Sequence, residues 1–289
     1  MTHTSNYGQS VKSRLLNLAK KENIPYQQLL TRYFQERLLF RLSQSEYREH
    51  FVLKGGALLY AYDHFAARPT LDIDFMGDRI DNDAENIKKA FSSICNIQCE
   101  EDGVHFLADT LKAESITVEK EYPGIRISLV ATLDTIRQTI SMDTGFGDIV
   151  IPKPEELDYP VLLADLPSTN ILAYSLETVV AEKFQTMIER TTFNSRMKDF
   201  YDLYRIGLTQ TLDTEMLQEA IRATFANRGT IYSENHILFS DKFASDPDLN
   251  QRWDAFLKKI KYEPRVSFAE VMVQIQNWLK PYWENLKGV

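Results

Sequence analysis

Two short stretches, FVLKGGAL at residues 51–58 and LDIDF at residues 71–75, indicate the fold and the chemistry of this sequence. In the first, an apolar run meets the pair Gly55-Gly56 and then continues with helical spacing, which predicts a strand, a tight turn and a helix. In the second, apolar and acidic residues alternate strictly, which predicts a strand with both aspartates on one face. The sequence therefore predicts a glycine turn that exposes backbone amides, followed by two carboxylates on one strand.

A third carboxylate, Asp143, ends another predicted strand, Gln138–Asp143, whose apolar residues share the opposite face. Glycines let backbone amides approach phosphate oxygens closely, and two or three carboxylates hold one or two Mg²⁺ or Mn²⁺ ions. Metal-dependent phosphoryl or nucleotidyl transfer needs both features. We therefore predict that Asp72, Asp74 and Asp143 are metal ligands, and that Asp143 takes the proton of the attacking hydroxyl.

Each of these features also has a simpler interpretation. A glycine pair is typical of any tight turn, Asp72 and Asp74 fit the solvated face of an edge strand, and Asp143 fits a turn-initiating cap before Gly145. The glycine signatures of Walker, dinucleotide-binding and protein-kinase sites are not matched.

The composition is that of an ordinary folded chain, with 289 residues, 44% hydrophobic residues and a formal charge of −8. Disorder, collagen and disulfide scaffolds are excluded, and the acidic balance argues against a nucleic-acid coat over the whole surface. Two helices are predicted at 11–21 and 25–43, and both are basic, which indicates a phosphate-facing side; the alternative is a solvated helix face. The basic residues concerned are Lys12, Arg14, Lys20, Lys21, Arg32, Arg37 and Arg41.

The predicted organisation is α+β, with a sheet-and-helix part followed by a helical part. A crossover helix is expected at 83–94 and a strand at 125–133, and the prolines of 152–167 predict a link out of the sheet. From Ser175 onward the pattern is helical, and the expected segments are 176–188, 197–206, 217–225, 249–260 and 268–279, with Pro281 as a late kink or stop. This predicts one domain over residues 1–165 and a helical C-terminal domain over 166–289.

Cys95 and Cys99 are the two cysteines, and their spacing predicts thiols one helical turn apart, reduced and without the further ligands of a zinc site. The segment Met1–Gln9 is polar and lacks the apolar core of a secretion signal. No apolar run approaches the ~18 residues that a membrane span needs. A cytoplasmic protein that does not contact membranes is therefore expected.

Taken together, these motifs resemble those of the AbiEii-type nucleotidyltransferase toxins of abortive-infection and type IV toxin–antitoxin systems. The similarity extends over about residues 30–260 and rests on five segments: 51–58, 71–75, 140–148, 178–184 and 194–204. It implies a polymerase-beta-like nucleotidyltransferase fold, a mixed sheet flanked by helices, in the first domain. It also implies Mg²⁺ dependence, a nucleoside triphosphate as donor, tRNA as the acceptor in some members, and an antitoxin partner with a winged-helix DNA-binding part.

This sequence departs from related transferases in its glycine motif. Gly56 supplies no hydroxyl, so phosphate contacts must come from backbone amides. The 15 residues between Gly56 and Asp72 form a longer loop than in many related transferases. We expect this loop, which contains His64, Arg68 and Thr70, to influence the choice of base or acceptor.

The resemblance implies roles for residues of the helical segments. Lys183 is predicted to contact a phosphate, although a solvated lysine is the alternative. Asp199 is predicted to orient Lys183 or the nucleotide, although with Asp202 and Lys198 it also fits a surface ion-pair pattern. Arg196 and Lys198 are expected to meet phosphates, and Lys54 lies either at an exposed strand end or near the triphosphate.

The predicted function is thus metal-dependent transfer of a nucleoside monophosphate from a triphosphate to an acceptor hydroxyl on tRNA, with growth inhibition as the result. Two alternatives stay open. One is a non-catalytic module of the same fold that binds a nucleotide or a partner protein. The other is a transferase with a small-molecule acceptor such as an antibiotic, for which an acidic acceptor cleft is expected in place of a basic one.

Overall fold

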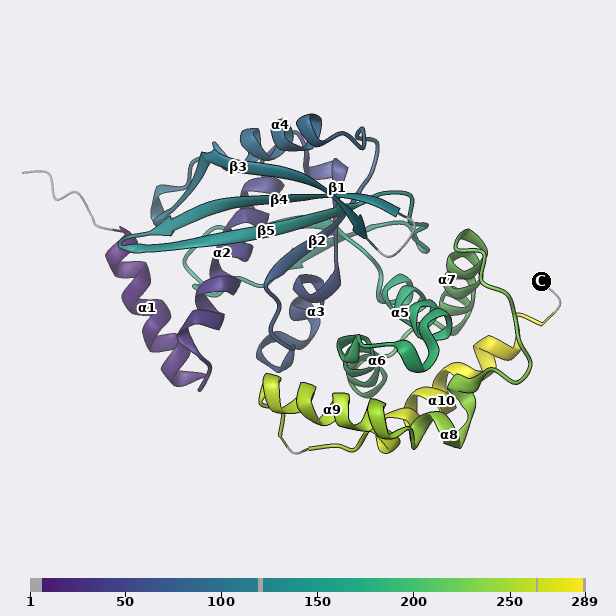
Figure 1. Cartoon of the computed structure of the whole chain (residues 1–289). Coiled ribbons are helices and arrows are strands. Elements are labelled where there is room, and N and C mark those ends of the chain that lie inside the picture. The colour runs from purple at the N-terminus through teal and green to yellow at the C-terminus, as the bar shows by residue number, and fades with distance from the viewer. Residues whose placement is uncertain (1–6, 119–121, 264, 288–289) are drawn as a thin grey trace, which may run out of the picture. The chain divides into compact units, whose positions relative to one another are not determined.

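The computed structural model describes residues 7–118, 122–263 and 265–287, and Figure 1 shows them in colour. The first six residues of the polar segment Met1–Gln9 lie outside this description. The chain divides into two compact units, one formed by Met1–Gly147 with Pro154–Tyr174 and the other by Asp148–Lys153 with Ser175–Val289. Each unit is described by itself below.

A mixed seven-stranded sheet forms the centre of the first unit, in the order β3-β4-β5-β2-β1-β7-β6. Strand β2 pairs antiparallel with β1 and parallel with β5, and β1 pairs parallel with β7. The predicted α+β class is therefore confirmed. The strands are β1 (Phe51–Lys54), β2 (Asp72–Gly77), β3 (Val104–Val118), β4 (Tyr122–Leu133), β5 (Ile136–Gly145), β6 (Glu155–Tyr159) and β7 (Thr169–Ala173).

Helix α4 covers one face of this sheet, as Figure 1 shows. The ring of Phe91 on α4 lies 4.9 Å from that of Phe51 and 6.2 Å from that of Phe75, centroid to centroid. Because side chains alternate along a strand, Asp72 and Asp74 lie on the other face. The helices of this unit are α1 (Tyr7–Lys21), α2 (Tyr26–Ser43), α3 (Gly55–Asp63) and α4 (Ala84–Cys95), with short 3₁₀ turns at Arg48–His50, His64–Ala66 and Glu100–Asp102.

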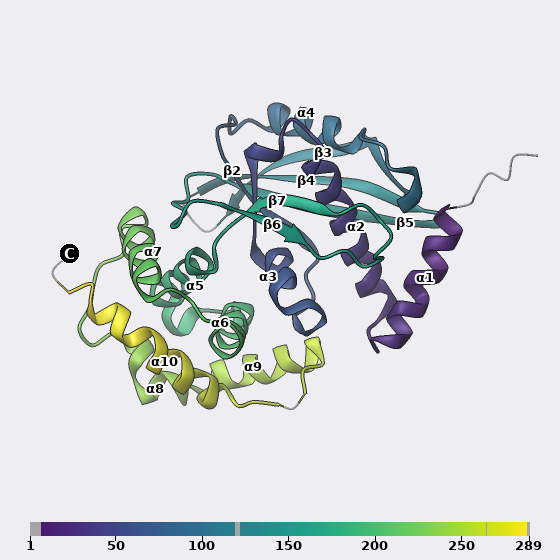
Figure 2. The ribbon, with the colours of Figure 1, turned by 180° about the vertical axis from the view of Figure 1, so that it is seen from behind.

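The prediction that the proline-punctuated segment 152–167 leaves the sheet is wrong. Strand β6 lies within it, and β7 follows it and pairs with both β6 and β1, as can be followed in Figure 2. The sequence EELDY of β6 is mostly polar because β6 is an edge strand, and Pro154 and Pro160 lie just outside its ends. A strand edge tolerates charge and proline, so the usual apolar signal is missing.

The prediction that the first two helices present a basic, phosphate-facing side is also wrong for α2, and so is the solvated alternative. Arg32, Arg37 and Arg41 are at most 4% exposed. The guanidinium of Arg41 donates to Asp102 at 2.6 and 3.2 Å. That of Arg37 lies 2.7 Å from the carboxylate of Glu36, whose pKa burial raises to about 7 although Arg37 opposes the shift. These arginines lie in the interior of the unit, because α2 is enclosed on nearly all sides.

Helix α1 keeps some of its charges at the surface. Lys12 pairs with Asp134 at 2.9 Å, Arg14 pairs with Asp165, and Lys20 and Lys21 are exposed. Within α1 and α2, both fully described, the basic residues thus form no continuous phosphate-facing surface.

The second unit is helical, as predicted. Its core contains rings from several helices: Phe184 of α5 lies 5.3 Å from Phe225 of α7, which lies 5.8 Å from Trp283 of α10. Helix α10 continues past Pro281 and ends at Glu284. The helices are α5 (Leu176–Arg190), α6 (Met197–Thr209), α7 (Thr214–Asn227), α8 (Asp241–Ala244), α9 (Pro247–Ile260) and α10 (Phe268–Glu284), with 3₁₀ turns at Thr191–Phe193 and Ile237–Phe239.

The two cysteines do not share a helix, which corrects that prediction. Cys95 is the last residue of α4 and is buried, whereas Cys99 precedes the 3₁₀ turn Glu100–Asp102; both thiols are free. The break after Cys95 explains the difference, because Asn96 caps α4. Among the described residues, no helix is both long and apolar enough to cross a membrane.

Candidate active site

Three carboxylates share the face of the sheet that lies opposite α4 in the first unit. Strand β2 is the fourth of seven strands, so the edge-strand interpretation of Asp72 and Asp74 is wrong. Both residues are half-buried, while Ile73 between them is buried on the other face. In the parallel pairing of β2 with β5, Asp74 lies opposite Asp143 and Asp72 lies opposite Ser141. Register partners project to the same side, so the structure brings all three aspartates to one surface.

Asp143 is held by an arginine that sequence reasoning missed. Its two carboxylate oxygens accept hydrogen bonds from Nε and Nη2 of Arg126, both at 2.7 Å. Arg126 lies on β4 directly opposite Asp143. These hydrogen bonds raise the pKa of Arg126, and the charges of Asp143, Asp72 and Asp74 add to the shift. Since Asp143 lies inside β5, the interpretation of it as a turn cap is wrong.

The signal that could have found Arg126 is the alternation of residues 125–129. Arg126 and Ser128 are the polar members of an otherwise apolar run, so they belong to the open face of their strand. Their position opposite Asp143 depends on the register of β4 with β5, which the pattern of a single strand does not contain.

The glycine turn lies directly against the carboxylate of Asp74. Gly55 has φ +69°, and a Cβ at this position would lie 2.1 Å from Oδ2 of Asp74. Lys54, the last residue of β1, lies opposite Asp74 in the antiparallel register, and its Nζ is 3.5 Å from the hydroxyl of Tyr174. The turn therefore requires glycine for two reasons, the backbone conformation and the close approach of the carboxylate.

The loop before β2 closes over the second glycine. A Cβ on Gly56 would lie 2.9 Å from Oγ1 of Thr70 and 3.2 Å from Nη1 of Arg68. The guanidinium of Arg68 is thus brought close to the first turn of α3, where the backbone amides of a helix favour anions.

The donor chemistry of this face fits a divalent cation, with one reservation set by Arg126. Neighbouring strands lie ~4.8 Å apart, so carboxylates on β2 and β5 are near one another. Carboxylate oxygens are the hard ligands that Mg²⁺ prefers. In residues 7–118, 122–263 and 265–287, however, no three His, Cys, Asp or Glu side chains converge as a ligand set. Both oxygens of Asp143 are turned to Arg126. The carboxylate chemistry of Asp72 and Asp74 suits a divalent cation, whereas Asp143 is engaged by Arg126.

A second cluster of charged residues lies within the helical unit. Nζ of Lys183 on α5 is 2.9 Å from Asp199 and 2.8 Å from Asp202, both on α6. Nε of Arg196 is 2.8 Å from the other oxygen of Asp199. The i, i+3 spacing places both aspartates on one face of α6. Lys198 is exposed on the same helix.

Burial decides between the interpretations of this cluster. Asp199 and Asp202 are at most 2% exposed, and the side chain of Lys183 is 11% exposed. The surface-ion-pair and solvated-lysine interpretations are therefore wrong. Burial acts to raise the pKa of Asp199, but Lys183 and Arg196 outweigh it and hold that pKa below its usual value.

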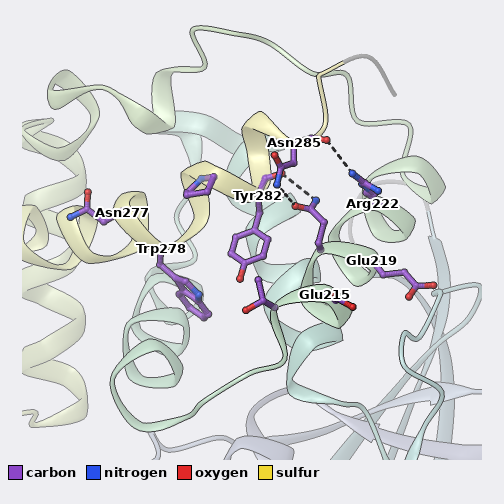
Figure 3. A pocket seen from close by; sticks show the side chains of 10 residues that line it. Glu215, Glu219, Arg222, Asn277, Trp278, Tyr282 and Asn285 are labelled. Carbon is purple, nitrogen blue, oxygen red and sulfur yellow. Dashed lines mark hydrogen bonds between the residues drawn. The ribbon is translucent and has the colours of Figure 1, made fainter.

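Two hollows in the structure are separate from these residues. The larger, of about 760 Å³, lies between α7 and α10, and Figure 3 shows Trp278 and Tyr282 from α10 and Glu215 and Arg222 from α7 at its wall. The smaller, of about 270 Å³, lies along α4 and β3. None of the predicted site residues lines either hollow.

Comparison with known proteins identifies a family and a similar fold. The family model of the AbiEii nucleotidyl transferase toxins of type IV toxin–antitoxin systems matches residues 37–274. The crystal structure of JHP933 from Helicobacter pylori is similar at 15% identity with a TM-score of 0.51, over 91% of this chain and 94% of that one. This similarity supports the fold alone.

A second H. pylori structure, labelled provisionally as a nucleotidyltransferase, is 15% identical with a TM-score of 0.48, over 91% of this chain and 98% of that one. No curated protein matches the sequence. The family match covers well over half of the 289 residues, including the glycine turn, the three aspartates of the sheet and the Lys183 cluster. The chain therefore belongs to the AbiEii family of nucleotidyltransferase toxins.

Proposed function

We propose that this nucleotidyltransferase moves a nucleoside monophosphate from a nucleoside triphosphate to a hydroxyl of tRNA, with Mg²⁺ or Mn²⁺ as the cofactor. The observation that carries the proposal is the shared sheet face of Asp72, Asp74 and Asp143 next to the glycine turn. Membership of the family implies a triphosphate substrate and an antitoxin partner. We further propose that this antitoxin has a winged-helix DNA-binding part, and that tRNA modification is what inhibits growth.

The proposed reaction exchanges a phosphoanhydride bond of the triphosphate for a phosphodiester bond to the acceptor. The acceptor oxygen forms a bond to the α-phosphorus, the bond between the α- and β-phosphates breaks, and pyrophosphate leaves. A bound divalent cation would neutralise the phosphates and make the acceptor hydroxyl more acidic. Asp72 and Asp74 are the proposed ligands, and Asp143 is the third ligand and the acceptor of the hydroxyl proton once Arg126 releases it.

The other predicted residues are proposed to bind phosphates. The amides of Gly55 and Gly56 at the start of α3 suit anionic oxygens, and Lys54 lies beside them in the chain. In the helical domain, predicted over residues 166–289, Lys183 is proposed to contact a phosphate. This proposal is supported by the contact between Asp199 and Lys183. The contact orients the ammonium of Lys183, as a phosphate contact requires. Arg196 and Lys198 are proposed as further phosphate contacts.

The test is a transfer assay with each labelled nucleoside triphosphate in turn, Mg²⁺ and total tRNA. Asp72→Asn and Asp74→Asn are expected to abolish labelling, as is chelation of the metal. Asp109→Asn, an exposed aspartate on β3 of the same sheet, is the matched control and should label tRNA like the unmodified protein.

Each other outcome identifies a different function. Full activity of Asp72→Asn and Asp74→Asn would refute the site. Triphosphate binding without labelling of any acceptor would favour the non-catalytic module. Labelling of an aminoglycoside in place of tRNA would favour the antibiotic transferase.

A further inference from the structure

The short connection from α5 to α6, residues 191–196, has a backbone that sequence propensity does not favour. Thr191 ends α5 with φ +46°, and its amide donates to the carbonyl of Met187. A β-branched residue in this region of backbone space is strained. Strain of this kind persists where a connection must hold a fixed shape.

The same connection contains a buried polar group that is only partly satisfied. Asn194 is fully buried, and its Oδ1 accepts a hydrogen bond from the amide of Arg196 at 2.9 Å. Its Nδ2 has no hydrogen-bond partner among the described residues. A buried unsatisfied donor lowers stability, as the strain at Thr191 does. The connection therefore holds its shape at a cost in stability, which points to a function.

The shape presents one aromatic ring to solvent among positive charges. Phe193 is 86% exposed. The nine residues 190–198 contain Arg190, Arg196 and Lys198 and no Asp or Glu, in a chain whose net charge is −8. Lys198 is exposed and the side chain of Arg196 is 31% exposed. An exposed aromatic ring with flanking cations is the combination with which proteins bind single-stranded nucleic acid.

We propose that Phe193 is a stacking platform for a base of the acceptor RNA, with Arg196 and Lys198 contacting the adjacent phosphates. The proposal deepens the proposed function, because it rests on RNA being the acceptor. Every base has a flat π-face, so this contact supplies affinity with little dependence on sequence. Isolated exposed apolar side chains are common on proteins, and it is the strained, anchored connection and its charges that distinguish Phe193.

The test measures RNA binding without catalysis. Fluorescein-labelled decauridylate and total tRNA are titrated with the full chain in EDTA without triphosphate, and anisotropy gives the affinity. Phe193→Ala is expected to weaken binding about 5- to 150-fold, the loss that corresponds to one base stack. Phe193→Trp should bind within about twofold of the unmodified protein, because it keeps an aromatic face.

A matched control is Leu208→Ala, which truncates a different exposed apolar residue. Leu208 lies on α6 and is 54% exposed. Its RNA affinity should not change. The urea midpoint of unfolding, followed by tryptophan fluorescence, should be the same for Phe193→Ala, Phe193→Trp and Leu208→Ala. In the transfer assay, Phe193→Ala should raise the KM for tRNA and leave that for the triphosphate unchanged.

The results separate this proposal from the proposed function. RNA binding that depends on Phe193, in a protein that transfers nothing to RNA, would support base stacking on Phe193 and overturn both the transfer to tRNA and the role of this RNA as the acceptor. Equal RNA affinity of Phe193→Ala and the unmodified protein, or no RNA binding by either, would overturn the stacking platform whatever the transfer assay shows. Loss of antitoxin binding with unchanged RNA affinity would also overturn it, in favour of a protein contact.

Discussion

Replacement of Lys183 tests the buried charges that join α5 to α6. In the intact cluster, the ammonium lies between Asp199 and Asp202, which are at most 2% exposed. Lys183→Met leaves two buried carboxylates with one positive charge fewer. Breaking a buried ion pair in this way costs about 3–5 kcal/mol. The free energy of unfolding of a whole domain is about 5–15 kcal/mol, so the variant should lose a large part of it.

Urea unfolding followed by tryptophan fluorescence suits this measurement, because Trp253, Trp278 and Trp283 all lie in the helical unit. With a urea dependence of about 1–3 kcal/mol per M, the midpoint should fall by about 1 M or more. Lys287→Met is the matched control. Its ammonium lies 2.9 Å from Glu234, but both side chains are more than 60% exposed, so the urea midpoint of this variant should stay close to that of the unmodified protein.

The pH dependence gives an independent check on this cluster. In the fold, Lys183 and Arg196 hold the pKa of Asp199 below 3.8 against the effect of burial. A lowered pKa stabilises the fold above pH 3.8, and this stability is lost as the pH falls through the folded pKa. The difference between the unmodified protein and Lys183→Met should therefore be largest near pH 7 and shrink under acid conditions.

A double variant completes the test. Lys183→Met with Asp202→Asn restores the balance of one carboxylate and one remaining cation, and it should recover much of the lost stability. An unfolding free energy of Lys183→Met within about 1 kcal/mol of the unmodified protein would refute the reasoning. If the expectation holds, loss of transfer by a Lys183 variant is evidence for a phosphate contact only where the variant is shown to be folded.

Three further experiments test other parts of the molecule. Gly55→Ala should lower stability by about 1 kcal/mol or more and abolish transfer, because its Cβ would overlap the carboxylate of Asp74. Gly229→Ala is the control, because Gly229 also has a positive φ but has open space around it, and this variant should keep full activity. Equal activities of the two variants would contradict the close approach of Gly55 to Asp74. Arg126→Gln should lower the Mg²⁺ concentration for half-maximal transfer about fivefold, because the guanidinium no longer competes with the metal ion for Asp143. The magnitude follows from one charge at ~4 Å in water, which is worth ~1 kcal/mol. An unchanged or higher Mg²⁺ requirement would count against that competition. Burial raises the pKa of the Cys95 thiol to about 12, so iodoacetamide at pH 8 should leave it unmodified in the native protein and alkylate it in urea, as mass spectrometry can show.

The strands that carry the aspartates were predictable because each has one buried face. Ile73 and Phe75 alternate with acidic residues in β2, and Ile140 and Met142 alternate with polar residues in β5. A strand with one buried and one solvated face commonly has this pattern. Helix α4 was predictable for the same kind of reason, since its buried residues recur at helical spacing after the cap at Asp83.

Other elements lacked a local signal. Strand β3 was missed because its register with β4 shifts between Leu107 and Lys112, and such an irregularity interrupts the alternation. The arginines of α2 have the sequence pattern of a solvated helix. Their burial depends on partners such as Asp102, 61 residues from Arg41 in the sequence, which helical periodicity does not reveal.

The candidate site divides in the same way. Its carboxylates lie on predictable strands, whereas the contact of Arg126 with Asp143 needs the register of two strands and that of Lys183 with Asp199 needs the packing of two helices. The positions of Arg126 and Lys183 beside their aspartates therefore depend on tertiary structure. The sequence could predict which strands and helices carry the candidate residues, but not which of these residues are already paired.

The parallel register of Asp74 with Asp143 has a consequence for the order of folding. These residues are about 70 positions apart, and the sequences of β3 and β4 lie between them in the chain. Contacts over such separations form slowly, because the entropy of closing a long loop is lost before the contact stabilises the chain. Strand β1 pairs with the nearby β2, but the third carboxylate arrives only with a distant strand. We therefore expect a nascent chain to complete the three-carboxylate face only after β5 has been synthesised and has paired with β2.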